Sequence, residues 1–239
     1  MSSISEKIKK EFASVADKKR AKNLAWFFKT GKGEYGEGDK FLGIALPEQR
    51  EIVKKYFCEA TLKDVERLMK DPFHEVRVTG VAILVSKYKK ADKKQKKEIY
   101  DFYLSHAKGI NNWDLVDISC HKIVGDWLLD KSRAPLYRLA RSKVLWERRI
   151  SIVSTFAFIH IGDLDDSYKL AEMLLGDKED LMHKAVGWVL RECGKKDKAR
   201  LVKFIKENGT HMPRTALRYA IEKFPEKERK RVLVETRQK

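Results

Sequence analysis

The most informative segment of this chain is the heptapeptide NNWDLVD at residues 111–117. It places Trp113 and Asp117 four residues apart, and side chains at this spacing lie side by side on a helix surface. The sequence beyond it is typical of a helix, because apolar residues recur at intervals of three and four. This apolar stripe consists of Val116, Cys120, Ile123, Val124 and Trp127. The pattern predicts a helix that holds an aromatic ring next to a carboxylate.

Two interpretations of this pair remain open at the level of the residues alone. A carboxylate beside the face of a tryptophan is suited to stabilising a cation. Alternatively, Trp113 belongs to the core, and Asp114 and Asp117 only favour the helix start, where the helix dipole attracts negative charge. The rest of the sequence bears on the choice between them.

The sequence pattern predicts helices over nearly the whole chain. It has only 5 prolines, and no segment alternates apolar and polar residues convincingly between hairpin signals. Thr61 and Asp64 have the spacing of a near capping box, which marks a helix start. Pro47 and Pro72 stand near two further starts. Apolar residues recur at helical spacing in residues 74–88, 98–106, 113–129, 146–160, 166–175, 181–193, 199–206 and 214–224. Stop signals after helical runs are Gly162, Gly176 and Gly194.

A weak internal repeat indicates how these helices are organised. Residues 75–82 are similar to residues 147–154, and Arg149 follows Arg77 by 72 residues, which is two periods of 36. Trp113 lies halfway between these two arginines, 36 residues after Arg77. A repeat of this length is typical of stacked helix pairs in an α-solenoid with one continuous concave face. We therefore expect an all-α fold, with residues 1–239 forming a single curved domain.

The charge of the chain favours an anionic partner. Its 239 residues include 52 Lys and Arg against 35 Asp and Glu, which gives a net charge of +17 and a pI near 9.6. Such an excess is the usual footprint of a nucleic-acid binder, although it also attracts anionic membranes. No apolar run approaches the roughly 18 residues of a membrane-spanning helix. We expect an intracellular, cytoplasmic protein that associates with DNA and not with membranes.

Cysteine and histidine usage points away from disulfide and metal chemistry. An odd number of widely spaced cysteines, Cys58, Cys120 and Cys193, argues against a disulfide framework and fits a reducing compartment. The six histidines show no metal-ligand spacing with these cysteines. The glycine-rich residues 31–38 lack the GxxxxGK[ST] spacing of a P-loop, so they predict a flexible connector. We expect neither a metal nor a nucleotide cofactor.

Four short segments, in this order and spacing, resemble the AlkD-type DNA alkylation repair glycosylases, a family built from HEAT-like helical repeats. The segments are FLGI at 41–44 with Pro47 and Arg50 after it, WDLVD at 113–117, WERR at 146–149 and KAVGWVLRE at 184–192. The resemblance spans nearly the whole chain. It implies excision of cationic alkylpurines, such as 7-methylguanine and 3-methyladenine, from duplex DNA while the base stays stacked.

The resemblance also assigns roles to individual residues. Asp117 matches the family's catalytic aspartate, and Trp113 and Trp188 match its two cleft tryptophans. Arg149 matches a DNA-contacting arginine. Where the family tends to place a tyrosine near the DNA, this chain has Phe27, so a hydroxyl contact to phosphate is lost while the aromatic body remains.

The neighbours of Trp188 support a surface that meets DNA. On a helix, Met182, Ala185, Val186, Val189, Leu190 and Cys193 form an apolar stripe, whereas Trp188 shares the other face with cations. We expect two of these cations, Lys184 and Arg191, to bind DNA. Arg149 has a second interpretation, as a structural arginine that bridges neighbouring repeats.

The chemistry of the expected reaction suits these residue types. A cationic purine departs as a neutral base, so an oxocarbenium-like sugar is what remains to be stabilised. An ionised carboxylate and electron-rich aromatic faces both stabilise such a cation. We expect a monomeric DNA-alkylpurine glycosylase. Two alternatives stay open, namely a non-catalytic DNA-binding solenoid and a helical scaffold that binds an acidic protein.

Overall fold

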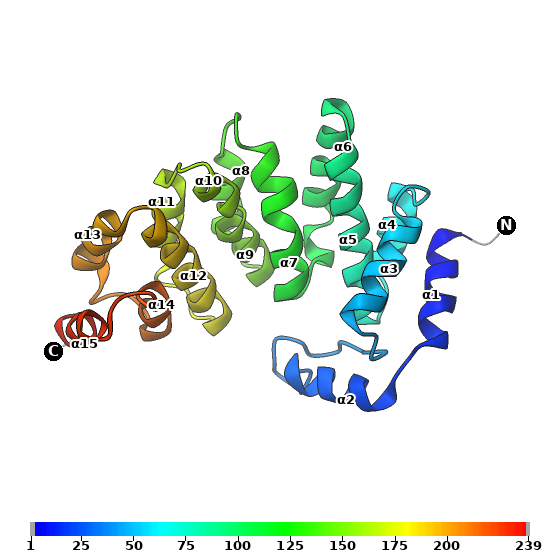
Figure 1. Cartoon of the computed structure of the whole chain (residues 1–239), viewed down its shortest axis with the longest axis horizontal. Coiled ribbons are helices and arrows are strands. Elements are labelled where there is room, and N and C mark those ends of the chain that lie inside the picture. The colour runs from blue at the N-terminus through cyan, green and yellow to red at the C-terminus, as the bar shows by residue number, and fades with distance from the viewer. Residues whose placement is uncertain (1–2, 238–239) are drawn as a thin grey trace. The chain divides into compact units, whose positions relative to one another are not determined.

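The computed structural model describes residues 3–237, so the predicted domain's residues 1, 2, 238 and 239 lie outside the described range. Within this range the regular secondary structure consists of α-helices and short 3₁₀ or π-helical turns, apart from an isolated bridge between Lys40 and Phe73. The all-α prediction is therefore confirmed for the part of the chain that is described. The helices group into two compact units, which meet in sequence between Ser119 and Cys120. Figure 1 labels the helices in chain order.

Unit 1 holds the N-terminal helices. They are α1 (Ile4–Ser14), α2 (Lys18–Phe27), α3 (Leu46–Tyr56), α4 (Leu62–Met69), α5 (His74–Lys90), α6 (Lys93–Ser105), the 3₁₀ turn η1 (Ala107–Gly109) and most of α7 (Trp113–Cys120). The start signals that the sequence predicts are confirmed. Thr61 forms a capping box with Asp64 at the start of α4, and Pro47 lies in the first turn of α3.

The core of unit 1 is built around α5 and the helices beside it. Most of α5 between His74 and Leu84 is buried, including several polar side chains at its N-terminal end. α7 is joined to α6 by a hydrogen bond between the hydroxyl groups of Tyr103 and Ser119, 2.8 Å apart and fully buried. This bond fixes the C-terminal end of α7, the helix that begins at Trp113.

The predicted helix over residues 113–129 is continuous in the chain but changes its geometry. α7 ends at Cys120, and residues His121–Gly125 form a π-helical turn, η2. Such turns often occur near functional sites. The apolar stripe expected here is confirmed, since Val116, Cys120, Ile123, Val124 and Trp127 are all buried.

Unit 2 holds the C-terminal helices. After η2 they are α8 (Ala134–Ala140), α9 (Leu145–Val153), α10 (Phe156–His160), α11 (Asp165–Leu174), α12 (Asp180–Lys196), α13 (Lys198–Asn208), α14 (Arg214–Ala220) and α15 (Glu226–Glu235). The run predicted over 146–160 is split into α9 and α10, because residues 154 and 155 interrupt the helix.

α12 is the central helix of unit 2. Its predicted apolar stripe, from Met182 to Cys193, is buried as expected. At Gly187 a Cβ would lie 2.5 Å from the carbonyl oxygen of Ala216, so glycine permits the close approach of α14. The stop predicted at Gly194 is wrong, because α12 continues to Lys196. A Cβ at Gly194 would clash with Leu201, so this glycine serves helix packing instead.

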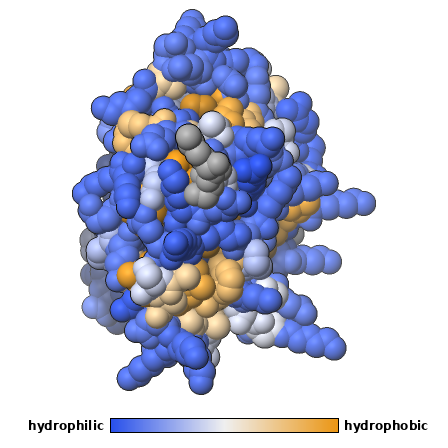
Figure 2. Space-filling model, turned by 90° about the vertical axis from the view of Figure 1, so that its right-hand side faces the viewer, coloured by the Kyte–Doolittle hydropathy of each residue, from blue (hydrophilic) through white to orange (hydrophobic). Residues whose placement is uncertain are grey.

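The surface is mainly hydrophilic. The face in Figure 2 is dominated by hydrophilic residues, with a few separate apolar patches between them. Trp26 on α2 is the most exposed of the large apolar side chains, at 83%. Among the described residues, no helix is long and apolar enough to cross a membrane.

Candidate functional site

In unit 1, Trp113 lies in an aromatic cluster. Its ring is stacked on that of Phe28, with centroids 5.3 Å apart and planes 15° apart. Phe27 meets Trp113 edge to face at 6.2 Å. Phe28 also stacks on Phe41 at 5.2 Å, and both phenylalanine rings contact the imidazole of His74, at 4.6 and 4.9 Å. Trp113 is therefore half-buried, with Phe28 behind one face of its indole.

A polar network lies against this cluster and is centred on His74. The imidazole Nδ1 is 3.2 Å from Asp39 and Nε2 is 2.8 Å from Asp114. Asp39 also accepts hydrogen bonds from Arg77, at 2.6 Å, and from the amide of Asn112, at 3.1 Å. The network thus joins the segment before α3, the start of α5 and the start of α7.

The charge of His74 follows from its partners. Burial disfavours the imidazolium, but the hydrogen bonds to Asp114 and Asp39 outweigh it and raise the pKa of His74 to about 9. The pKa of Asp39 is lowered, because its hydrogen bonds to His74 and Asn112 and the nearby charge of Arg77 outweigh the effect of burial. At neutral pH the network therefore contains a buried imidazolium between two carboxylates.

The segment that carries Asp39 is fastened to α5. The buried carboxylate of Glu75 accepts hydrogen bonds from the backbone N–H groups of Leu42, Gly43 and Ile44, at 2.7–3.3 Å. Gly43 has a φ of +81° and touches the backbone of Asp17, so only glycine suits this position. The flexible connector predicted over residues 31–38 therefore leads directly into a well-anchored segment.

The two carboxylates of α7 have different surroundings. Asp114 contacts His74 and accepts a hydrogen bond from the backbone N–H of Leu115 at 2.9 Å. Asp117 is half-buried and lies one turn further along the helix, four residues after Trp113. Asp114 is thus part of the structural network, and Asp117 is the carboxylate that shares the helix face with Trp113.

In unit 2, Trp188 lies on α12 in a smaller aromatic group. Its ring contacts that of Phe156 at 4.5 Å, and Phe156 meets His121 edge to face at 6.3 Å. Trp188 is half-buried while the apolar stripe on the same helix is fully buried, so it lies at the border of the core. This position agrees with the expectation that Trp188 lies outside the apolar stripe of its helix.

The cations predicted to bind DNA in unit 2 are engaged with protein groups. Arg149 is only 5% exposed and donates a 2.7 Å hydrogen bond to the carbonyl of Leu181, which links α9 to α12. Lys184 pairs with Asp180 at 2.7 Å, and Arg191 pairs with Glu222. The bond from Arg149 fits the structural interpretation of this arginine, whereas the DNA contacts of all three residues stay predictions.

The predicted residues are thus distributed over both units. Unit 1 contains Trp113 and Asp117 with Phe27, and unit 2 contains Arg149 and Trp188 with Lys184 and Arg191. Within unit 1 the structure brings Phe27 and Trp113 into ring contact. That all of them meet on one concave face stays a prediction.

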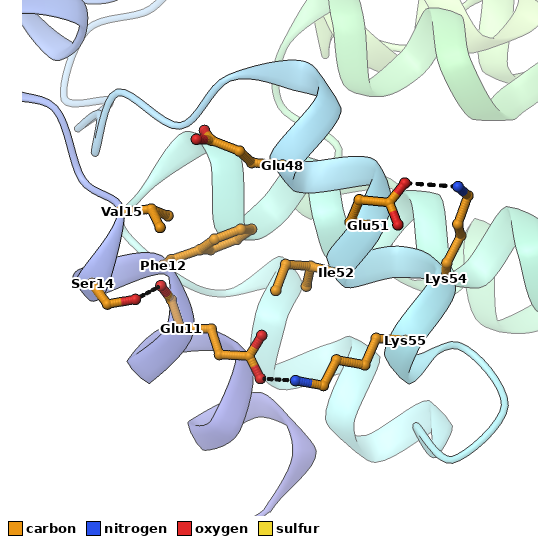
Figure 3. Close-up of a pocket in the computed structure, with 9 residues that line it drawn as sticks. All are labelled: Glu11, Phe12, Ser14, Val15, Glu48, Glu51, Ile52, Lys54 and Lys55. Atoms are coloured by element: carbon orange, nitrogen blue, oxygen red, sulfur yellow. Dashed lines mark hydrogen bonds and ion pairs between the residues drawn. The ribbon is translucent and has the colours of Figure 1, made fainter.

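A separate hollow of about 480 Å³ lies between α1 and α3 (Figure 3). Its wall is charged, with Glu11 bound to Lys55 at 2.6 Å and Glu51 bound to Lys54 at 2.7 Å. None of the candidate residues lines it. Across residues 3–237, no group of three or more His, Cys, Asp or Glu side chains is placed to hold a metal ion.

Comparison with known proteins places this helical fold among DNA repair proteins. The family model described as DNA alkylation repair enzyme matches residues 8–224. The chain therefore belongs to the DNA alkylation repair enzyme family. It is similar in fold to a solved structure described as a predicted DNA alkylation repair enzyme from Enterococcus faecalis. The two share 16% sequence identity and a TM-score of 0.68 over 88% of this chain and 97% of the other. A search of the curated proteins finds no match.

Sequence reasoning missed the residues that support Trp113. Phe28 and His74 carry no motif, and their contacts join segments that are 40 or more residues from Asp114 or Trp113. No signal in the sequence pointed to this network, because His74 and the two aspartates that bind it lie 35 and 40 residues apart in the chain. Their pairing could not be read from spacing.

Proposed function

We propose that this protein is a DNA glycosylase that hydrolyses the N-glycosidic bond of cationic alkylpurines, such as 7-methylguanine and 3-methyladenine, in duplex DNA. The observation that carries the proposal is the arrangement on α7. The indole of Trp113 is backed by Phe28, and Asp117 follows one helical turn later, in a chain of the DNA alkylation repair enzyme family. The family membership supplies alkylated DNA as the substrate class.

In the proposed reaction, the bond between the sugar C1′ and the purine nitrogen breaks, and the base takes the bonding electrons. Another ring nitrogen of the purine is already alkylated, so the purine is cationic before the bond breaks. The base therefore leaves neutral and needs no acid. Positive charge develops on the sugar, as in glycoside hydrolysis. Water then adds to C1′ and loses a proton to the surrounding solvent. The ionised carboxylate of Asp117 stabilises the sugar cation and orients this water.

Aromatic faces supply a second source of stabilisation. A cation over a tryptophan face gains roughly 0.5–2 kcal/mol, depending on how far water is excluded. Because Phe28 covers one face of Trp113, the indole has a fixed orientation toward a ligand on its remaining surface. We assign Trp188, at the border of the core of unit 2, to the same role.

The remaining parts of the proposal concern how DNA is held. We propose that the helices form a HEAT-like solenoid with a basic concave groove, and that a monomer binds duplex DNA there while the base stays stacked. The net charge of +17 supports backbone binding. Lys184 would exchange its exposed partner Asp180 for a phosphate, since exposed ion pairs are weak, and Arg191 would exchange Glu222 in the same way.

Base release from a duplex with a single 7-methylguanine tests the proposal. Under single-turnover conditions we expect the wild type to release the base and Asp117→Asn to be slower by about 10²-fold, with similar DNA affinity. Asp101→Asn is the matched control, because Asp101 is an exposed carboxylate on α6 that pairs with Lys97. A duplex with uracil, an uncharged base, should be a poor substrate.

Two outcomes would contradict the proposal in different ways. If the wild type binds the duplex without releasing the base, the protein is a non-catalytic DNA-binding member of the family. If the wild type is active and Asp117→Asn releases the base at the same rate, the carboxylate is structural.

A further inference from the structure

Asp39, His74 and Asp114 form a buried ionic network in unit 1. The side chain of His74 is 3% exposed, and each of its ring nitrogens faces a carboxylate oxygen, at 3.2 Å and 2.8 Å. A carboxylate can only accept hydrogen bonds, so both contacts are satisfied together only when both ring nitrogens carry protons. The geometry itself therefore favours the imidazolium.

Further groups complete the surroundings of this imidazolium. Phe28 and Phe41 pack against the ring, and aromatic faces favour a cation at these distances. Arg77, on the same helix, lies 3.4 Å from Nδ1 and opposes the charge, while it donates hydrogen bonds to Asp39 and to the backbone carbonyls of residues 71 and 72. The two carboxylates thus face two cations within a buried network.

Two contacts of His74, with Asp114 and with Phe28, lead to the proposed catalytic helix. Asp114 is the second residue of α7, and Asp117 lies three positions further along the same eight-residue helix. Phe28 touches His74 on one side and is stacked on Trp113 on the other. His74 therefore contacts one support of the helix start and one support of the indole.

We propose that His74 is a positioning residue for base excision, which fixes Trp113 and Asp117 through Asp114 and Phe28. The proposal rests on the proposed glycosylase function. A fixed helix start keeps the carboxylate of Asp117 at one distance from the sugar, and displacements of about 1 Å can cost ~10²-fold in rate.

The first test is the pH profile of single-turnover release of 7-methylguanine, corrected for uncatalysed release. We expect the wild-type rate to fall as His74 loses its proton near pH 9. His74→Gln should be slower by about 10-fold or more at pH 7 and should lack this alkaline decline, with unchanged DNA affinity. Asp114→Asn should shift the decline to lower pH. If His74→Gln keeps the wild-type rate and profile, the proposal is wrong.

The second test does not depend on excision. The indole N–H signal of Trp113, assigned by its loss in Trp113→Phe, is followed by NMR between pH 6 and 10.5. We expect it to titrate with the wild-type His74 and to be shifted and insensitive to pH in His74→Gln. An indole signal that is identical in both proteins and constant through pH 9 overturns the positioning role, whether or not the protein is a glycosylase. A protein with the expected titration but no base release refutes the proposed function alone.

His74→Gln must remain folded for these comparisons. Circular dichroism at each pH checks this, and Asp114→Asn provides a variant that keeps the imidazole. If only Asp114→Asn folds, this variant decides the question. Loss of the Asp114 carboxylate must lower the pH at which base release declines and at which the Trp113 indole signal changes. An unchanged pH for both would overturn the proposal.

Discussion

The rings of Phe28 and Trp113 are stacked, with centroids 5.3 Å apart and an angle of 15° between their planes. Phe28 is buried, whereas its neighbour Phe27 is 55% exposed and meets the same indole edge to face. Two consecutive residues at the end of α2 therefore make different contacts with one tryptophan. Phe28 supports the ring from within the core, and Phe27 borders it on the surface.

Phe28→Leu should lower both stability and activity. Leucine keeps the apolar character but loses the ring contacts to Trp113, Phe41 and His74, so we expect a loss of roughly 1–3 kcal/mol in the free energy of unfolding. Base release should slow because the indole loses its support. Urea unfolding and single-turnover release measure the two effects. Phe27→Leu is the control and should cost clearly less stability. Equal losses in both variants would refute the distinction.

The stability of the protein should depend on pH through His74. Its pKa is about 9 in the folded protein against 6.5 as the ordinary value, so the folded state binds the proton more tightly. The stabilisation is fully present below about pH 6.5 and is lost as the pH rises through about 9, on the order of 3 kcal/mol in all. Urea unfolding of wild type and His74→Gln at each pH isolates this contribution. A difference between the two that is constant from pH 6 to 10 would exclude the raised pKa.

DNA binding should weaken steeply with salt. Each phosphate contact releases counterions, which gives a log–log slope of about −0.9 per contact for duplex DNA. Lys184→Ala should make the slope shallower by about one contact. Lys203→Ala is the control, because Lys203 pairs with Glu207 on its own helix, as Lys184 pairs with Asp180, but lies outside the predicted DNA-binding set. Fluorescence anisotropy at several salt concentrations measures both, and an affinity that is flat with salt would favour a protein-binding scaffold.

Arg149→Ala should destabilise unit 2 whatever its effect on DNA. The substitution leaves the carbonyl of Leu181 without this donor, which costs about 1–3 kcal/mol when the group is buried. Arg141→Ala is a matched control, since Arg141 is exposed and donates to the carbonyl of Tyr137. Thermal unfolding compares the two. If Arg149→Ala unfolds like the wild type and only DNA affinity falls, Arg149 is a DNA contact and not a bridge.

Local sequence was sufficient for most of the helices and for much of their burial, although α1, α2, α8 and α15 lie outside the predicted helical runs. The periodicity around Val116 and Met182 predicted the buried stripes, and the cap at Thr61 predicted the start of α4. These features depend on residues within one or two turns of each other, so spacing alone reports them. The signal at Gly194 was misleading, because a glycine that ends a helix and one that lets Leu201 approach look the same in sequence.

The tertiary structure alone decided how the candidate site is supported. The sequence named Trp113 and Asp117 as candidate residues, but it could not separate them from Asp114, which the structure places in a network with His74. That distinction depends on His74, which lies 40 residues from Asp114 in the chain and reaches it only when the fold brings the start of α5 to the start of α7. Hydrogen bonds and ring stacking act over a few ångströms, and only folding sets those distances between remote residues. The physical reason is that helical periodicity encodes which face is buried but not which side chains meet there.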